Sequence, residues 1–324
     1  MKAILQERFG PPEVLRLVDI DRPEPGADDV LVRVHAAALN PYDWHMLRGD
    51  PRIARLMGVG LTRPRARVAG VDGAGRVEVV GANVRGLQPG DEVLGIFRGS
   101  FAEYAPAGAD MVVPKPPSLT FEEAAAVPMA ATTALRGIRD VGEVRSGQRV
   151  LVNGAAGGVG TFAVQIATAL GAEVTGVCSA RNVELVRSSG AAHTVDYATQ
   201  DFTDGRERYD VILDNVGNRP LSRLRRALTP RGTLVLNSGG SPGHLVGAVG
   251  SLLKAIVVNV FVRQRLRPLP TKLKREDLLT LTELIEAGKL RPVLDRTYPL
   301  ADAAEGLRRV EAGHARGKVV ITVA

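Results

Sequence analysis

The sequence predicts an α/β protein with two domains, an antiparallel β domain and a doubly wound parallel sheet flanked by helices. Three observations predict this fold. The chain has 324 residues, which exceeds the length of one typical domain. Before Phe121, short apolar segments alternate with turns rich in proline and glycine, as in antiparallel sheets. From Phe121 onward, helical apolar patterns alternate with short β-branched runs, which is typical of parallel strands joined by helices.

The first domain is predicted from alternating strands and the turns between them. Proline and glycine mark two of these turns, Arg22–Gly26 and Gln88–Asp91. The strands are expected near Leu31–His35, Gly75–Val80, Glu92–Ile96 and Met111–Pro114.

The second domain is predicted from buried strands that alternate with segments of helical pattern. They are expected near Val150–Asn153, Val174–Cys178, His193–Val195, Val211–Asp214, Thr233–Asn237 and Ile256–Val262. A linker at Arg267–Pro270, helices at Glu276–Ala287 and Asp302–Ala312 and a closing strand at Lys318–Val323 complete the chain.

Composition narrows the classes of partner and compartment. Hydrophobic residues make up 45% of the chain and charged residues 24%, as in soluble globular enzymes. No apolar run approaches the roughly 18 residues that span a bilayer, and no signal-peptide core follows Met1. Cys178 is the only cysteine, which rules out an intrachain disulfide. We therefore expect a cytoplasmic protein with no membrane partner.

The net charge of +7 raises the question of nucleic-acid binding. The arginines are scattered, and the one modest basic cluster has no interleaved aromatic residues for base stacking. We interpret this cluster as a solvated face or a dimer rim and predict no nucleic-acid partner. It comprises Arg263, Arg265, Arg267, Lys272, Lys274 and Arg275.

A glycine-rich turn follows the strand Arg149–Asn153 and opens a helix. Its glycines, at 154, 157, 158 and 160, allow a pyrophosphate to approach the backbone, and the helix N-terminus offers N–H groups to it. We predict contacts from Gly154 and from the backbone amides of Gly157, Gly158 and Val159. A tight turn without a ligand is the alternative. The apolar face of the helix is expected at Val159, Phe162, Ala163, Ile166 and Leu170.

The ends of later strands indicate the kind of cofactor. An NAD site usually has an acid after the second strand, but this strand ends in Cys178-Ser-Ala-Arg181. Ser179 and Arg181 suit a 2′-phosphate, which favours NADP(H), although Arg181 as a solvated surface charge is the alternative. Asn215, Val216 and Ser238 end further strands at the edge where ligands bind in such sheets.

Several ordered motifs resemble one known family. They are Ala69–Gly81, Gly86–Val93, Val127–Ala134, the glycine-rich turn and the ending Gly317–Val320. Over essentially its whole length the chain resembles the medium-chain dehydrogenase/reductase superfamily, and within it the zinc-independent quinone oxidoreductase branch. The resemblance implies a GroES-like catalytic domain at residues 1–122, completed by 264–324, and an NADP-binding Rossmann domain at 123–263.

The zinc-dependent branch of the superfamily has metal ligands that this sequence lacks. Asn40 stands where that branch has its first cysteine ligand, Gly70-Val71-Asp72 replaces Gly-His-Glu, and no cysteine lies near Pro128–Thr133. The four-cysteine structural zinc loop is also absent. A site built from the remaining candidates would need unusual geometry, so we predict no metal. Those candidates are His35, Asp43, His45 and Asp72.

Without a metal to stabilise an alkoxide, quinones and α,β-unsaturated carbonyls are the easier substrates, because their oxygen takes up charge through conjugation. We predict an NADPH-dependent quinone or enone reductase with a small-molecule substrate. The alternatives are a zinc-free alcohol or ketone reductase and a non-catalytic NADPH-binding regulatory protein.

Candidate catalytic residues lie at Asn40 and directly after it, and the resemblance bears on the first of them. It places the amide of Asn40 near the nicotinamide or the substrate oxygen, with a structural cap before Pro41 as the alternative. Tyr42 is a candidate proton donor, with a packed ring and a proton from solvent as the alternative. Asp43 either fixes the local turn or touches a ligand.

Further cofactor contacts follow from the resemblance. Thr133 matches a position that contacts the nicotinamide, or else is a hydroxyl at a helix N-terminus. Tyr197 matches a residue near the 2′-phosphate, with edge packing as the alternative, and Lys318 reaches the cofactor or is a surface lysine. The family pairs subunits through the region of Ile256–Val262, so we expect a homodimer.

Overall fold

The computed structural model describes residues 1–50, 60, 63–237, 258–259, 262–270 and 273–323, and it divides into two compact units. Unit 1 comprises Met1–Thr132, Leu273–Gly288 and Pro292–Ala324, and unit 2 comprises Thr133–Lys272 and Lys289–Arg291. The predicted boundaries at 122 and 263 lie about ten residues before those of the units, which end a first segment at 132 and a second at 272.

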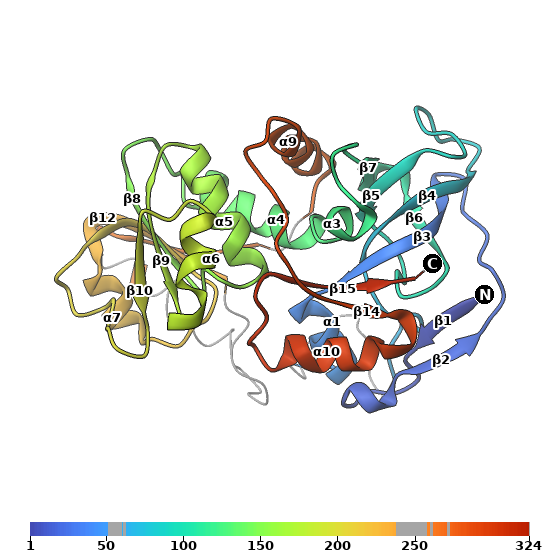
Figure 1. Ribbon diagram of the computed structural model, residues 1–324, viewed down its shortest axis with the longest axis horizontal. Coiled ribbons are helices and arrows are strands. Elements are labelled where there is room, and N and C mark those ends of the chain that lie inside the picture. The colour runs from blue at the N-terminus through green and yellow to red at the C-terminus, as the bar shows by residue number, and fades with distance from the viewer. Residues whose placement is uncertain (51–59, 61–62, 238–257, 260–261, 271–272, 324) are drawn as a thin grey trace. The chain divides into compact units, whose positions relative to one another are not determined.

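Unit 1 is built around a mainly antiparallel sheet in the order β14-β15-β3-β4-β5-β7, with β6 also paired to β3. The long strand β3 has buried apolar residues along most of its length and lies at the centre of this sheet. The C-terminal strand β15 pairs antiparallel with it, Val319 opposite Leu39, so the chain's end completes the sheet (Figure 1). The strands of this unit are β1 (Lys2–Leu5), β2 (Arg16–Asp19), β3 (Asp29–Leu39), β4 (Asp72–Val80), β5 (Glu92–Ile96), β6 (Tyr104–Gly108), β7 (Val112–Pro114), β14 (Leu294–Pro299) and β15 (Lys318–Thr322).

Short helices cover this sheet. The core beneath them joins Leu39 and Ile321 of the sheet to Trp44, Leu47 and Leu307 of two helices. These contacts bury the apolar faces of both helices and fix the segment that follows β3. The helices of unit 1 are α1 (Pro41–Arg48), α3 (Phe121–Ala125), α9 (Arg275–Glu286), α10 (Ala303–Glu311) and the first part of α4 (Pro128–Leu135), with 3-10 turns at Pro12–Val14, Ala109–Met111 and Leu300–Asp302.

Unit 2 is a parallel sheet in the order β10-β9-β8-β11-β12-β13. The chain starts at β8, moves outward through β9 and β10, and then continues from β11 on the other side of β8. This doubly wound order reverses between β8 and β11, the place where ligands bind in such folds. Its strands are β8 (Arg149–Asn153), β9 (Glu173–Cys178), β10 (His193–Asp196), β11 (Tyr209–Asp214), β12 (Leu228–Leu236) and β13 (Arg265–Pro268).

The helices of unit 2 connect these strands, and α5 and α6 pack against β9. As predicted, α5 buries Phe162, Ala163 and Ile166, but Leu170, which caps its C-terminus, is 38% exposed. The helices are α5 (Gly158–Ala169), α6 (Val183–Ser188) and α7 (Leu221–Arg226), with a π-helical turn at Arg136–Val141 and a 3-10 turn at Ala180–Asn182. The predicted α/β fold, with an antiparallel and a parallel sheet, is confirmed.

The last strand of the parallel sheet differs from its prediction. It is Arg265–Pro268, within what was expected to be a linker. Of the predicted strand Ile256–Val262, Val258 and Asn259 are helical, and most of the rest lies outside the described residues. An apolar run by itself does not distinguish a strand from a helix, which explains the error. The homodimer expected from this segment stays a prediction.

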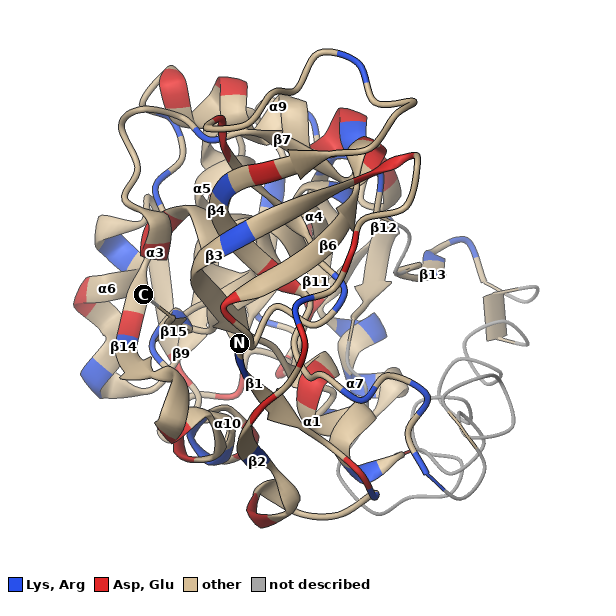
Figure 2. Ribbon diagram, turned by 90° about the vertical axis from the view of Figure 1, so that its right-hand side faces the viewer, with Lys and Arg blue, Asp and Glu red and all other residues tan. Residues whose placement is uncertain are grey.

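The charged residues are interspersed, as Figure 2 shows on helices and strands alike. Two arginines of the predicted basic cluster have an acidic partner, since Arg265 and Arg267 both pair with Glu143, at 2.7 and 2.6 Å. Among the residues that the structure describes, no helix is long and apolar enough to cross a membrane.

Candidate functional site

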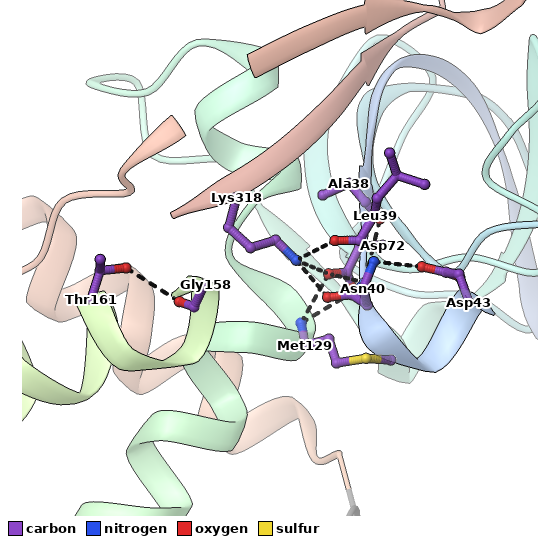
Figure 3. A network of polar contacts seen from close by, with 9 residues as sticks. All are labelled: Ala38, Leu39, Asn40, Asp43, Asp72, Met129, Gly158, Thr161 and Lys318. Carbon is purple, nitrogen blue, oxygen red and sulfur yellow. Dashed lines mark hydrogen bonds and ion pairs between the residues drawn. The ribbon is translucent and has the colours of Figure 1, made fainter. Parts of the chain in front are cut away.

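A buried polar cluster in unit 1 surrounds the ammonium group of Lys318. This side chain, at the start of β15, is only 3% exposed. Its Nζ donates to the carbonyl oxygen of Leu39 at 3.1 Å and to Oδ1 of Asn40 at 2.5 Å (Figure 3). It lies 3.6 Å from Oδ2 of Asp72. The last strand thus holds the end of β3 through a charge that is shielded from water.

Asn40 directs its side chain into this cluster. It stands at the N-cap position of α1, but its Nδ2 donates to Asp72 Oδ2 at 3.0 Å and to the Ala38 carbonyl at 3.3 Å. Both amide protons therefore have acceptors within unit 1, while Oδ1 accepts from Lys318. Asn40 is 2% exposed, so its evident role is to hold Asp72 and Lys318 together.

Asp72 links the cluster to the start of α4. Its carboxylate is fully buried and accepts from the backbone N–H of Met129 at 3.1 and 3.3 Å. The first N–H groups of a helix lack partners within the helix, and a negative charge there is favourable. Asp72 therefore accepts hydrogen bonds from the start of α4 and from Asn40, and it also pairs with the charge of Lys318.

Burial changes the proton affinity of every ionisable group in this cluster. Loss of solvent raises the pKa of Asp72 and lowers the pKa of Lys318, while their mutual attraction opposes both shifts. The pKa of Asp43, which accepts from the Asn40 N–H at 2.7 Å, is raised by burial to about 7. Because burial and the nearby Asp72 carboxylate both disfavour its charge, Asp43 is partly protonated near neutral pH.

We expect Asp43→Asn to flatten the pH dependence of stability. Because the pKa of Asp43 lies above its ordinary value of 3.8, the folded state binds a proton that the unfolded chain releases, and stability falls as pH rises toward 7. Asparagine keeps an acceptor for the Asn40 N–H without this charge. Relative to the wild type, the variant should gain about 2–3 kcal/mol as the pH rises from about 5 to about 8. Denaturant unfolding of both proteins across this range measures the gain, and parallel curves would contradict it.

Tyr42 differs from its neighbours in being accessible. It is in the first turn of α1, 43% exposed, and its hydroxyl has no hydrogen-bond partner in the described part of the chain. Partial burial and the nearby Asp43 raise the pKa of this phenol, so it stays protonated at neutral pH. The ring is not packed in the core, and its proton is available to a ligand.

In unit 2, the turn between β8 and α5 has the geometry of an anion site. Gly154 has a φ of 79°, which glycine adopts without strain, and Gly157 is the N-cap of α5. The predicted donor N–H of Gly157 is bonded to the Gly154 carbonyl at 3.1 Å within the turn. The N–H groups of Gly158 and Val159 stand in the first turn of the helix, where backbone donors lack helical partners. A Cβ on Gly160 would lie 2.1 Å from the Gly154 carbonyl oxygen, so only glycine lets the helix approach the turn this closely.

The predicted 2′-phosphate residues lie at the ends of two neighbouring strands. Cys178 and Asp196 are partners in the register of β9 and β10, and the Tyr197 N–H donates to the Cys178 carbonyl at 3.1 Å. Ser179 follows β9 directly, and Arg181 is exposed with no ion pair to any described residue. Tyr197 is 49% exposed, which argues against simple edge packing.

Two side chains that the sequence analysis did not select organise the edge of β8 and β11. Asp214 Oδ1 accepts from Asn153 Nδ2 at 2.8 Å and from the N–H groups of Val216 and Gly217 at 3.1 and 3.0 Å. Asn215 donates to the Asn153 carbonyl at 3.2 Å. The sequence contained the information to select Asn153 and Asp214. Both are polar residues that end predicted strands, and the ends of neighbouring parallel strands meet at one edge of the sheet.

Other predicted cofactor residues have different outcomes. Val216 is 46% exposed and lies beside Gly154, where an added Cβ would come within 2.8 Å of the Val216 side chain. Thr133 lies well inside α4 and not at its N-terminus, which removes the alternative of a capping hydroxyl. Ser238 lies outside the described residues. Lys318 is not a surface lysine, because it is 3% exposed and donates to Leu39 and Asn40 of unit 1.

Comparison with family models agrees with this architecture. Residues 26–117 match the alcohol dehydrogenase GroES-like domain, and residues 189–321 match the zinc-binding dehydrogenase family.

Comparison with individual proteins covers the whole chain. It is 34% identical to the mitochondrial NAD(P)H oxidoreductase RTN4IP1 of Mus musculus, over 100% of this chain and 89% of that protein. The chain belongs to the medium-chain dehydrogenase/reductase superfamily. This medium-chain oxidoreductase is also 33% identical to the 2-methylene-furan-3-one reductase of Solanum lycopersicum, over 99% of the chain and 79% of that protein. Its structure resembles the quinone oxidoreductase of Coxiella burnetii with a TM-score of 0.85 and 32% identity, covering 100% and 99% of the two chains. The quinone-oxidoreductase-like resemblance is confirmed.

One matching family model is named for zinc, and the residues of this medium-chain oxidoreductase do not fit that ion. The Lys318 ammonium donates to Asn40 Oδ1 and lies 3.6 Å from the candidate ligand Asp72, so a positive charge already stands beside these oxygens. His35 stacks on Phe121 and His45 on Trp44. In the described ranges, no group of three or more His, Cys, Asp and Glu side chains is placed to hold a metal.

Proposed function

We propose that this protein is a zinc-independent reductase that uses NADPH to reduce a quinone or an α,β-unsaturated carbonyl compound. The observation that carries the proposal is the ammonium of Lys318, which donates to Asn40 at the position of the first cysteine ligand in the zinc-dependent branch and supplies a fixed positive charge there. The quinone oxidoreductase and the methylene-furanone reductase among its relatives support this substrate class.

Unit 2 has the residues to bind the cofactor. The N–H groups of Gly158 and Val159 suit the pyrophosphate, and Ser179 and Arg181 suit the 2′-phosphate. Thr133, Tyr197, Asn215 and Val216 are proposed as further contacts. When bound, the reduced nicotinamide supplies a hydride.

Unit 1 has the residues for the proton. Hydride addition to a conjugated carbon leaves negative charge on the substrate oxygen, and conjugation disperses this charge without a Lewis acid. The accessible phenol of Tyr42 donates a proton to that oxygen. Asn40 does not donate, since its amide protons bind Ala38 and Asp72, so its part is to fix the segment that leads into Tyr42.

The proposal is tested by following the loss of reduced-cofactor absorbance with NADPH and NADH. Small quinones, enones and simple ketones serve as acceptors, each with and without a metal chelator. We expect chelator-insensitive turnover of quinones or enones that is faster with NADPH. Turnover confined to ketones and alcohols would favour the zinc-free alcohol or ketone reductase instead. NADPH binding without turnover of any acceptor would favour the regulatory protein.

We expect Tyr42→Phe to lower kcat for enones about 10- to 100-fold while leaving the Kd of NADPH unchanged. Phenylalanine keeps the ring and removes only the hydroxyl group. An enolate oxygen is more basic than a hydroquinone oxygen, so the loss should be smaller with quinones. Steady-state kinetics on both acceptors measure the difference. Equal kcat values in the variant and the wild type would show that solvent supplies the proton.

A further inference from the structure

Asn182 is a buried polar residue next to the proposed 2′-phosphate site. It closes the 3-10 turn that begins after Ser179 and is 7% exposed. Its Nδ2 donates to the Ser179 hydroxyl oxygen at 3.2 Å, and its Oδ1 is buried without a partner among the residues that the structure describes. The backbone N–H of Asn182 separately donates to the Ser179 carbonyl at 2.9 Å.

The local fold does not need an amide at this position. The turn is closed by the backbone bond from Asn182, which any residue except proline would make. A buried oxygen without a partner destabilises the folded state, so an apolar side chain would be better for stability alone. The contact that this amide adds among the described residues is the one to Ser179.

That contact decides what the Ser179 hydroxyl offers to a ligand. A hydroxyl has one proton and two lone pairs. Because Asn182 donates to a lone pair, the proton is not drawn toward Asn182, and it has no acceptor among the residues with described positions. The hydroxyl is therefore set as a donor, which suits a phosphate whose oxygens accept.

The carboxylate of Asp196 would repel a 2′-phosphate at this strand edge, so the hydrogen-bond donors to that phosphate become more important. Asp196 lies opposite Cys178 in the strand register, and Cys178 directly precedes Ser179 in the chain. Its Oδ1 accepts from the Ala198 N–H at 3.1 Å, and the carboxylate remains part of this strand edge. A 2′-phosphate in this neighbourhood needs donors that are already oriented.

We propose that Asn182 is a specificity-determining positioning residue that orients the Ser179 hydroxyl to donate to the 2′-phosphate of NADPH. This inference rests on the proposed function, specifically on NADPH as the cofactor. Asn182 acts through Ser179 and does not itself touch the cofactor.

The test is the ratio of the Kd values of NADH and NADPH, measured by calorimetry on the full chain. Asn182→Asp keeps the shape but presents only acceptor oxygens, which draw the hydroxyl proton away from the ligand. We expect this ratio to fall about tenfold or more in Asn182→Asp and about threefold in Asn182→Ala. Ser189→Ala is the matched control, because its buried hydroxyl bonds to the Leu185 carbonyl at 2.8 Å without contact to Ser179. Its ratio should match the wild type.

A second background tests whether Asn182 acts through Ser179. In a Ser179→Ala protein, Asn182→Ala should have no further effect on the ratio, because its route to the ligand is gone. An undiminished effect in that background would overturn the proposal.

Two further outcomes separate this inference from the proposed function. If Ser179→Ala or Arg181→Ala lowers the ratio but both Asn182 variants leave it unchanged, Asn182 has no positioning role and the NADPH proposal survives. If Ser179→Ala and Arg181→Ala also leave it unchanged, the NADPH preference itself fails, and with it the role of Asn182.

Discussion

Replacing Lys318 by methionine is expected to lower the free energy of unfolding by about 3–5 kcal/mol. Methionine fills a similar volume but removes the ammonium that binds Asn40 and faces Asp72. The Asp72 carboxylate, which is fully buried, then has no compensating positive charge, and the Leu39 carbonyl loses its donor. Removing one partner of a buried ion pair leaves the other charge unpaired, and the resulting loss of stability exceeds the net contribution of the intact pair.

The pH dependence and a double variant identify the cause of this loss. Without Lys318, the pKa of Asp72 should rise further, so the deficit of Lys318→Met should shrink at acid pH, where protonation neutralises the carboxyl. Adding Asp72→Asn removes the unpaired charge and keeps an acceptor for the Met129 N–H. We expect the double variant to recover about 1–2 kcal/mol of the loss.

Denaturant unfolding monitored by circular dichroism, at about pH 5 and about pH 8, measures these effects. Lys289→Met is a suitable control, since Lys289 is an exposed lysine near a helix end. A loss below about 1 kcal/mol in Lys318→Met at both pH values would mean that the buried charge pair contributes little.

The fold could be predicted because its signals are local. Periods of apolar residues, proline- and glycine-rich turns and the glycine-rich turn at Gly154–Gly160 each report on a few neighbouring residues. The prediction failed at β13, where one buried apolar residue, Leu266, stands between two arginines. The ion pairs of those arginines with Glu143 join residues far apart in sequence, and no local pattern reveals them.

The candidate site shows even more clearly that local patterns do not reveal contacts between residues far apart in sequence. Sequence reasoning selected both Asn40 and Lys318 but assigned the first to catalysis and the second to the cofactor. Their side chains are hydrogen-bonded across a separation of 278 residues. Pairing across such a distance depends on β15 aligning with β3, so the shared cluster becomes visible only once the sheet is formed. Asp72 was considered only as a metal ligand for the same reason.

Replacing Gly160 by alanine is expected to destabilise unit 2 by about 3 kcal/mol and to weaken cofactor binding at least about tenfold. The new Cβ would lie 2.1 Å from the Gly154 carbonyl oxygen and 2.8 Å from backbone atoms of Ala155. These are backbone atoms that cannot rotate away, so α5 must move from the turn. Its N–H groups then no longer point at the proposed pyrophosphate position.

Gly157→Ala is the matched comparison because it separates binding from folding. Its Cβ meets only the Gly154 carbonyl oxygen, at an ordinary 3.5 Å, and the extended backbone of Gly157 (φ −81°, ψ 175°) accepts any residue. We therefore expect Gly157→Ala to unfold like the wild type yet bind NADPH more weakly, since the methyl group occupies space that a pyrophosphate needs. Thermal unfolding without cofactor and calorimetric titration with NADPH distinguish the two variants. If Gly157→Ala binds NADPH as tightly as the wild type, the pyrophosphate does not lie at this helix N-terminus; if Gly160→Ala retains full stability, the close approach of helix and turn is not required by the fold.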